Sequence, residues 1–240
     1  TSDWTEVVKL IPNDPTDEAL FGISISIDGD TAVIGARSYY SGIGAAYIFT
    51  RDTPGSLTSG WTQRAKLVGS DTASGDSFGQ NVSIGGDTVV IGTPHDDDHG
   101  TDSGSVYVFT RDTPGSLTSG WTQSTKLTAD DASDPDQFGT HVTIEGDTIV
   151  VGAKFKSDVA YLNGRAYVFS RDAAGNWTQT SSFVASDASL SDKATFGNIV
   201  AISGDTILIS ASGTGGGSSG LLFNSGAVYI YTLEITPINP

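Results

Sequence analysis

The sequence has no cysteine and no methionine among its 240 residues. Without cysteine, disulfides, thiolate metal ligands and thiol nucleophiles are excluded. Proline is scarce, with 8 residues, whereas glycine is plentiful, with 30. No apolar stretch approaches the roughly 20 residues that a membrane-spanning helix needs, so we expect no membrane insertion. The length and the hydrophobic fraction of 37% predict an ordinary packed core.

Positive charge is also scarce, because 12 basic residues face 28 acidic ones and give a formal net charge of −16. Such a polyanion repels phosphate backbones and anionic membranes, so nucleic acid is excluded as a partner. Carbohydrate or protein ligands, cations and further copies of the chain stay open as partners. The start at Thr1, without a methionine, indicates a mature or trimmed product, and we therefore expect a secreted, extracellular protein.

The sequence repeats itself four times. A Phe-Gly pair recurs at spacings of 57, 60 and 58 residues, and nine residues after each Phe comes the Asp of a Gly-Asp-Thr triplet. A Tyr-x-Phe or Tyr-x-Tyr pair and a Trp-Thr pair complete each unit. The four Phe-Gly pairs begin at Phe21, Phe78, Phe138 and Phe196. Repeats of this length are typical of propellers and solenoids.

Each unit predicts four short strands. The first two flank Gly-Asp, where glycine supplies the positive φ of a tight hairpin turn, and the fourth alternates in polarity from its Trp onward. We therefore expect an all-β fold, a four-bladed β-propeller with four antiparallel strands per blade. The whole chain, 1–240, is then one domain with repeats at about 11–67, 68–127, 128–183 and 184–240 plus 1–10.

The two ends predict how this ring closes. Residues 4–10 match the fourth strand of a unit but precede the first Phe-Gly, whereas the last unit stops after the strand that holds Tyr229 and Tyr231. We therefore expect the N-terminal strand to complete the last blade. The alternative is an open piece of a larger, seven-bladed ring.

These motifs resemble the FG-GAP repeat family, and Phe78-Gly79 with Val90-Ile91-Gly92-Thr93-Pro94 is the nearest match. The resemblance implies an integrin-like propeller that serves in binding or adhesion. Family members often carry a calcium loop between the first two strands of a repeat. Here that connection is only a two-residue turn, as in Ile27-Asp28-Gly29-Asp30, which cannot supply the six to eight oxygens that calcium needs.

One acidic loop predicts a cation site elsewhere. Asp96, Asp98 and Asp102 alternate around Gly100, and such carboxylates can converge on one calcium ion. Two alternatives remain open: a hydrated acidic loop, and a zinc site at His95 and His99. A second set of aspartates recurs four residues after each Trp strand, and we interpret it as turn-capping: Asp14, Asp71, Asp131 and Asp187.

Exposed aromatic residues predict a ligand-binding surface. Four of them depart from the strand pattern and fall in the connections before the Tyr-x-Phe strands of the first and third units: Tyr39, Tyr40, Phe155 and Tyr161. They can stack on sugar rings, or they can fold onto their own loops.

No catalytic constellation appears. We therefore expect a non-catalytic binding or adhesion module, lectin-like and cation-assisted. A structural unit of a larger extracellular assembly is the alternative, and a glycan-acting enzyme is the least favoured function.

Overall fold

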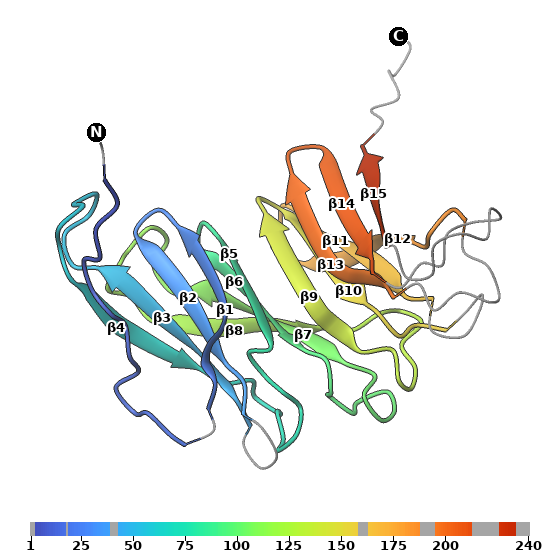
Figure 1. The fold of residues 1–240 in the computed structure, drawn as a ribbon, viewed down its shortest axis with the longest axis horizontal. Coiled ribbons are helices and arrows are strands. Elements are labelled where there is room, and N and C mark those ends of the chain that lie inside the picture. Colours follow the sequence, from blue (N-terminus) through green and yellow to red (C-terminus); the bar gives the residue numbers. More distant parts are fainter. Residues whose placement is uncertain are drawn as a thin grey trace, which may run out of the picture.

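The computed structural model describes residues 3–17, 19–38, 43–157, 163–187, 195–212 and 226–233. Within these ranges the regular structure is all β, in four antiparallel sheets that follow one another along the chain (Figure 1). No helix of the length and apolarity of a membrane span occurs in the described part.

The strands are short and their order within each sheet is sequential. The first sheet holds β1 (Phe21–Asp28), β2 (Thr31–Ala36), β3 (Ala45–Arg51) and β4 (Trp61–Leu67). The second holds β5 (Asn81–Gly85), β6 (Thr88–Thr93), β7 (Ser105–Arg111) and β8 (Trp121–Leu127). The third holds β9 (Phe138–Glu145), β10 (Thr148–Ala153), β11 (Arg165–Arg171) and β12 (Trp177–Phe183). In the fourth, the described residues form β13 (Phe196–Ser203), β14 (Thr206–Ala211) and β15 (Ala227–Thr232).

The Gly-Asp turns join the first two strands of each sheet, as the sequence predicts. The glycine that opens each turn has φ between 54° and 57° at Gly29, Gly86, Gly146 and Gly204. Residues other than glycine rarely adopt this conformation. Each turn therefore fixes the register of its hairpin, for example Asp28 opposite Thr31.

The core lies between successive sheets. We call the face that carries the Phe of Phe-Gly the leading face of a sheet, and the opposite face its trailing face. The trailing face of the first sheet, with Val33 and Ile48, packs on the leading face of the second, with Phe78 and Ile84. The same arrangement joins the second sheet to the third and the third to the fourth. Tyr107, Phe109, Val90 and Ile91 are buried between the sheets, and Trp61 is half-buried.

A glycine-to-carbonyl contact sets the distance between neighbouring sheets. A Cβ atom added to Gly35, Gly92 or Gly152 would lie 2.2, 2.0 or 1.8 Å from the carbonyl oxygen of the Phe-Gly glycine in the next sheet. No side chain fits at such distances, so each of the three junctions requires glycine on its second strand.

The predicted closure of the ring is not formed. Residues 4–10 form no strand and Trp4 is fully exposed, while β15 pairs only with β14 among the described strands. Figure 1 shows an arc that is open between the first and the last sheet. The physical reason lies at Ser210, which occupies the position of the three junction glycines. Its Cβ opposes a fourth junction with the same close approach between the last and the first sheet.

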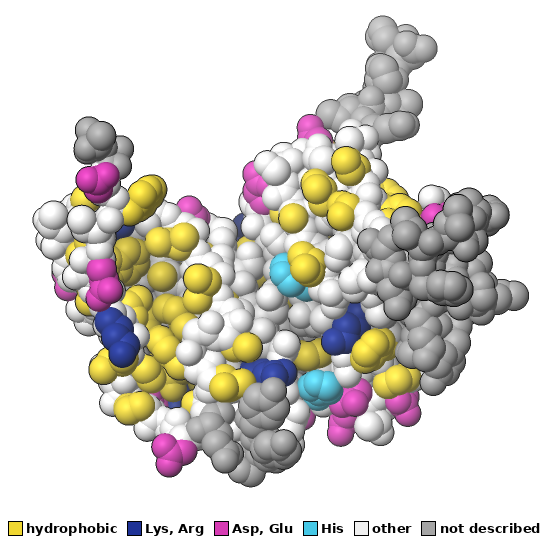
Figure 2. All heavy atoms as spheres, viewed as in Figure 1, with side chains coloured by type: hydrophobic (Ala, Val, Ile, Leu, Met, Phe, Trp, Pro, Cys, Tyr) yellow, Lys and Arg dark blue, Asp and Glu magenta, His cyan; other side chains and the backbone are white. Residues whose placement is uncertain are grey.

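The open arc leaves one leading face and one trailing face uncovered. Ile25 on β1 is 75% exposed, whereas its equivalent Val82 is 4% exposed. Ile230 on β15 is 67% exposed, whereas its equivalent Val108 is fully buried. Figure 2 shows hydrophobic side chains gathered on both sides of the opening, over the first and the last sheet.

The junction contact leads to a testable prediction. We expect Gly92→Ala to lower the free energy of unfolding by about 1–3 kcal/mol, because the new methyl group must push two sheets apart. Urea denaturation measures this loss. Gly85→Ala on the neighbouring strand is the matched control, because a Cβ there meets nothing closer than 3.4 Å. Equal losses in the two variants would contradict a glycine-dependent junction.

Candidate functional site

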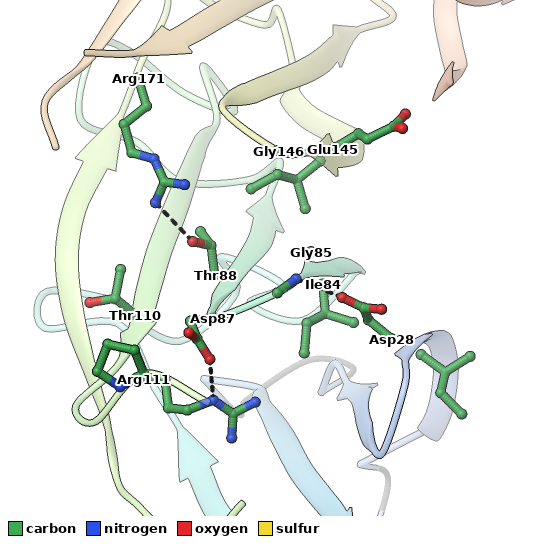
Figure 3. A pocket seen from close by; sticks show the side chains of 14 residues that line it. Asp28, Ile84, Gly85, Asp87, Thr88, Thr110, Arg111, Glu145, Gly146 and Arg171 are labelled. Carbon is green, nitrogen blue, oxygen red and sulfur yellow. Dashed lines mark hydrogen bonds and ion pairs between the residues drawn. The ribbon is translucent and has the colours of Figure 1, made fainter. Parts of the chain in front are cut away.

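The Gly-Asp turns of the first three sheets lie together at one rim of the arc and surround a pocket of about 690 Å³. We call it the turn-rim pocket (Figure 3). Its charged side chains come from three sheets, and isoleucines form its apolar part: the charged residues are Asp28, Asp87, Arg111, Glu145 and Arg171.

The arginines of this pocket are structural. The aspartate of each of the first three Gly-Asp turns accepts a hydrogen bond from the arginine that ends the third strand, at 2.6 Å for Arg111 and Asp87. Arg111 also donates to Thr31 of the preceding sheet at 3.0 Å, and Arg171 donates to Thr88 at 3.1 Å. Each guanidinium group lies over the tryptophan of its own sheet. These arginines therefore tie the sheets together, and Figure 3 shows the bond of Arg171 to Thr88 of the preceding sheet.

Two exposed carboxylates of the pocket are held by the backbone. Asp28 accepts a hydrogen bond from the Gly86 amide at 2.6 Å, and Glu145 accepts one from the Gly204 amide at 2.9 Å. The pocket thus presents fixed acceptor oxygens beside the aliphatic side chains of Ile84 and Ile144. Such a surface suits a ligand with hydroxyl groups and an apolar face.

The sequence did not predict this pocket, because the Gly-Asp-Thr triplets were interpreted as turns alone. The available signal was an arginine at the end of three of the four third strands, at Arg51, Arg111 and Arg171. Only the curvature of the arc brings three such turns to one place.

The acidic loop lies at the opposite ends of the strands from these turns. Lys126 of β8 places its ammonium group 2.9 Å from Asp96 and 2.5 Å from Asp98. Asp102 instead contacts the His95 ring at 2.8 Å. The structure therefore brings two of the three predicted ligands together, around a lysine. In the described ranges, no group of three or more His, Asp or Glu side chains is arranged to hold a metal ion.

Three aspartates of the repeated set hold tyrosines, and the fourth, Asp14, contacts Lys66. The hydroxyl of Tyr107 donates to Asp71 at 2.7 Å, and that of Tyr167 donates to Asp131 at 2.8 Å. Tyr229 makes the same bond to Asp187. In two units a second aspartate, five residues further along the chain, caps the turn instead. Asp76 accepts a hydrogen bond from the Ala73 amide, and Asp136 accepts one from the Ser133 amide.

Burial and charge shift the titration of this network. Burial, and next the Asp71 carboxylate, raise the pKa of the Tyr107 hydroxyl. The hydrogen bond from Tyr107, followed by Lys126, lowers the pKa of Asp71. Burial alone would lower the pKa of Lys126, but its bonds to Asp98, Asp96 and the other partners together raise it. The lysine therefore stays charged as the resident cation of these carboxylates.

The predicted ligand-stacking aromatics do not line the turn-rim pocket. Tyr39, Tyr40 and Tyr161 lie outside the described residues. Phe155 is half-buried beyond the end of β10, away from the turns, and Lys154 lies 4.9 Å from its ring centroid. His141 on β9 is half-buried as well, and burial lowers its pKa.

The lysine-centred network gives a prediction with a pH dependence. We expect Lys126→Gln to lower the free energy of unfolding at pH 7 by about 1.5–3 kcal/mol, because the buried Asp96 loses its cation. Lys66→Gln is the matched control, since Lys66 holds the exposed Asp14 and an exposed pair contributes below about 1 kcal/mol.

The pH dependence follows from Asp71, whose pKa is lowered by folding. Its stabilising contribution is present above the unfolded value of about 3.9 and is lost as the pH falls through the folded pKa. The difference between Lys126→Gln and the parent should therefore shrink in acid. A loss that persists unchanged there would contradict the network.

Calcium at the acidic loop stays a prediction, and Lys126 sharpens its test. An ion shared by Asp96 and Asp98 must displace the ammonium group, so millimolar calcium should raise the unfolding temperature of Lys126→Gln more than that of the parent chain. Asp98→Ala should abolish the shift. If calcium changes the unfolding temperature of all three proteins equally, the acidic loop binds no calcium and is a hydrated loop.

Comparison with known proteins agrees with this repeat structure. A comparison with curated proteins finds no significant match. The family model of the FG-GAP repeat matches residues 4–49, 61–109, 121–169 and 177–231. Each matched segment begins at a tryptophan and ends in the third strand of a sheet. The resemblance drawn from the Phe-Gly motifs is thereby confirmed, and the chain belongs to the FG-GAP repeat family.

Proposed function

We propose that the chain is a non-catalytic extracellular binding module that takes a hydroxyl-rich ligand, a saccharide, in the turn-rim pocket. The observation that carries the proposal is the pair of fixed carboxylates, Asp28 and Glu145, beside aliphatic side chains in a pocket of about 690 Å³. Carboxylates accept hydrogen bonds from sugar hydroxyls, and the aliphatic side chains cover the apolar face of a sugar ring.

Charge favours a neutral ligand over an anionic one. The formal net charge of −16 repels anions, and the pocket arginines are already engaged with aspartates. FG-GAP repeats are typical of extracellular proteins and generally form β-propeller modules without catalytic activity. These family properties support an extracellular binding role for the open arc.

A second function, as a structural unit of a larger extracellular assembly, is favoured by the two uncovered sheet faces. Ile25 and Ile230 lie on these faces and are well exposed, whereas every equivalent position inside the arc is buried. Exposed apolar faces of this kind mark sites of association.

A glycan array with labelled protein tests the binding role. We expect binding to be lost, or weakened at least ~10-fold, in Asp28→Ala and in Glu145→Ala, since each removes a charged acceptor. Asp172→Ala is the matched control, because Asp172 is an exposed carboxylate outside this pocket. Binding that survives both pocket variants would place the ligand elsewhere, and an array without any binding would contradict the saccharide.

A further inference from the structure

Residues 4–10, which we call the N-terminal segment, have the sequence of a fourth strand but belong to no sheet. Their sequence Trp-Thr-Glu-Val-Val-Lys-Leu shares its Trp, Thr, Lys and Leu with β4 and β8. The last of these residues, Leu10, packs against the leading face of the first sheet, as Leu67 packs against that of the second. The N-terminal segment thus lies where the fourth strand of a preceding sheet would lie.

In the fourth sheet, no fourth strand is found among the described residues. Each of β3, β7 and β11 pairs on one side with a Trp strand, whereas β15 pairs only with β14 among the described strands. Its free edge presents unpaired backbone groups, which favour the addition of a strand from another segment. The trailing face of this sheet is also open, with Val228 and Ile230 exposed.

Charge complementarity links the N-terminal segment to the free edge of the fourth sheet. In the first two sheets a lysine of the fourth strand contacts the aspartate of the repeated set, as Lys66 does with Asp14 and Lys126 with Asp71. In the fourth sheet Asp187 accepts a hydrogen bond from Tyr229, but none of the described lysines contacts it. Lys9 occupies the equivalent position of the N-terminal segment and would place a lysine beside Asp187.

Apolar substitutions coincide at the same junction. Inside the arc, the first strand of each sheet, its inner strand, carries polar side chains that meet the next sheet. Ser24 on β1 donates to the Gly79 carbonyl, and Asn81 on β5 accepts from the Val142 amide. On β13 this position is Ile199, which is exposed. The position beside Gly22 on the first sheet is Ile23, where the other units have Gln80, Thr140 and Asn198. Two apolar residues thus replace polar ones on the two faces that would meet.

Closure within one chain is opposed by Ser210. In the three existing junctions a Cβ at this position would lie about 2 Å from a carbonyl oxygen of the next sheet, so the inner strands of a fourth junction must stay farther apart. To close the ring within one chain, the first and last sheets must come together at a fixed angle. This movement must also open the three packed junctions between the existing sheets. A separate copy can tilt, so its outer strands pair while its inner strands keep this distance.

We therefore propose that the N-terminal segment of one copy of the chain adds to β15 of a second copy as its fourth strand. The same contact covers the leading face of the first copy with the trailing face of the second. A reciprocal exchange between two copies gives a closed dimer, and a one-way exchange gives a longer assembly. This inference rests on the structural role proposed above and is independent of the turn-rim pocket.

The internal sheets predict the register of the exchange. Thr50 lies opposite Thr62 and Thr110 lies opposite Thr122, so Thr232 should lie opposite Thr5. Opposite residues of antiparallel strands have Cα atoms about 4.5–5.5 Å apart, within the range of a disulfide. The native chain has no cysteine, so engineered thiols have no competitors.

Mixing two single-cysteine variants, Thr5→Cys and Thr232→Cys, under mild oxidation tests the proposal. We expect a disulfide-linked heterodimer, identified by mass spectrometry, in the mixture and far less linkage in either variant alone. Thr206→Cys replaces Thr232→Cys as the matched control, because Thr206 lies on the neighbouring strand β14 opposite Thr232. Equal linkage with Thr206→Cys would overturn the predicted register.

Sedimentation of the full-length chain gives the second measurement. Val8→Pro removes an amide donor from the N-terminal segment and should shift the assembly to monomers, whereas Val8→Thr, which keeps this donor, should not. A disulfide within one chain of the double variant Thr5→Cys/Thr232→Cys, with a monomeric parent, would overturn exchange in favour of closure.

The remaining outcomes separate the inference from the function on which it rests. An assembly that is unaffected by Val8→Pro and forms no heterodimer would overturn strand exchange but leave the structural role standing. A monomeric parent chain without any cross-link would overturn both.

Discussion

The contact between a second-strand glycine and the carbonyl oxygen of the next sheet is the constraint on which the rest of the structure depends. It repeats at Gly35, Gly92 and Gly152 and brings neighbouring inner strands to a common distance. At that distance the aliphatic trailing face of one sheet reaches the aromatic leading face of the next. The same distance between neighbouring sheets also brings successive Gly-Asp turns together at one rim. The turn-rim pocket is therefore a consequence of the glycine junctions.

The repeat made the local structure predictable from the sequence. Gly-Asp turns, alternation after each Trp and the Tyr-x-Phe pairs predicted sixteen strands in four antiparallel sheets, and the described residues form fifteen of them, all but the N-terminal one. These features depend on neighbours in the chain or on the period of two along a strand. Closure of the ring was not predictable in this way, because it depends on the angle between sheets and on one Cβ atom at Ser210.

The candidate site shows the same division. The sequence placed Asp96, Asp98 and Asp102 in one loop, but the position of Lys126, which contacts two of them, depends on the pairing of β7 with β8. The aspartates of the repeated set were recognised as structural from their recurrence. Their partners, the tyrosine hydroxyls, are 36 residues away for Asp71 and Asp131 and could be found only from the packed sheets.

The sequential order of the sheets has a consequence for cooperativity. Within the described ranges each sheet packs on its neighbours along the chain, so the stability of the arc is close to a sum of sheet and junction contributions. The two inner sheets each have two junctions, whereas the outer sheets each have one. Hydrogen exchange should therefore be slowest in the strands of the second and third sheets, and local opening should start at the ends of the arc.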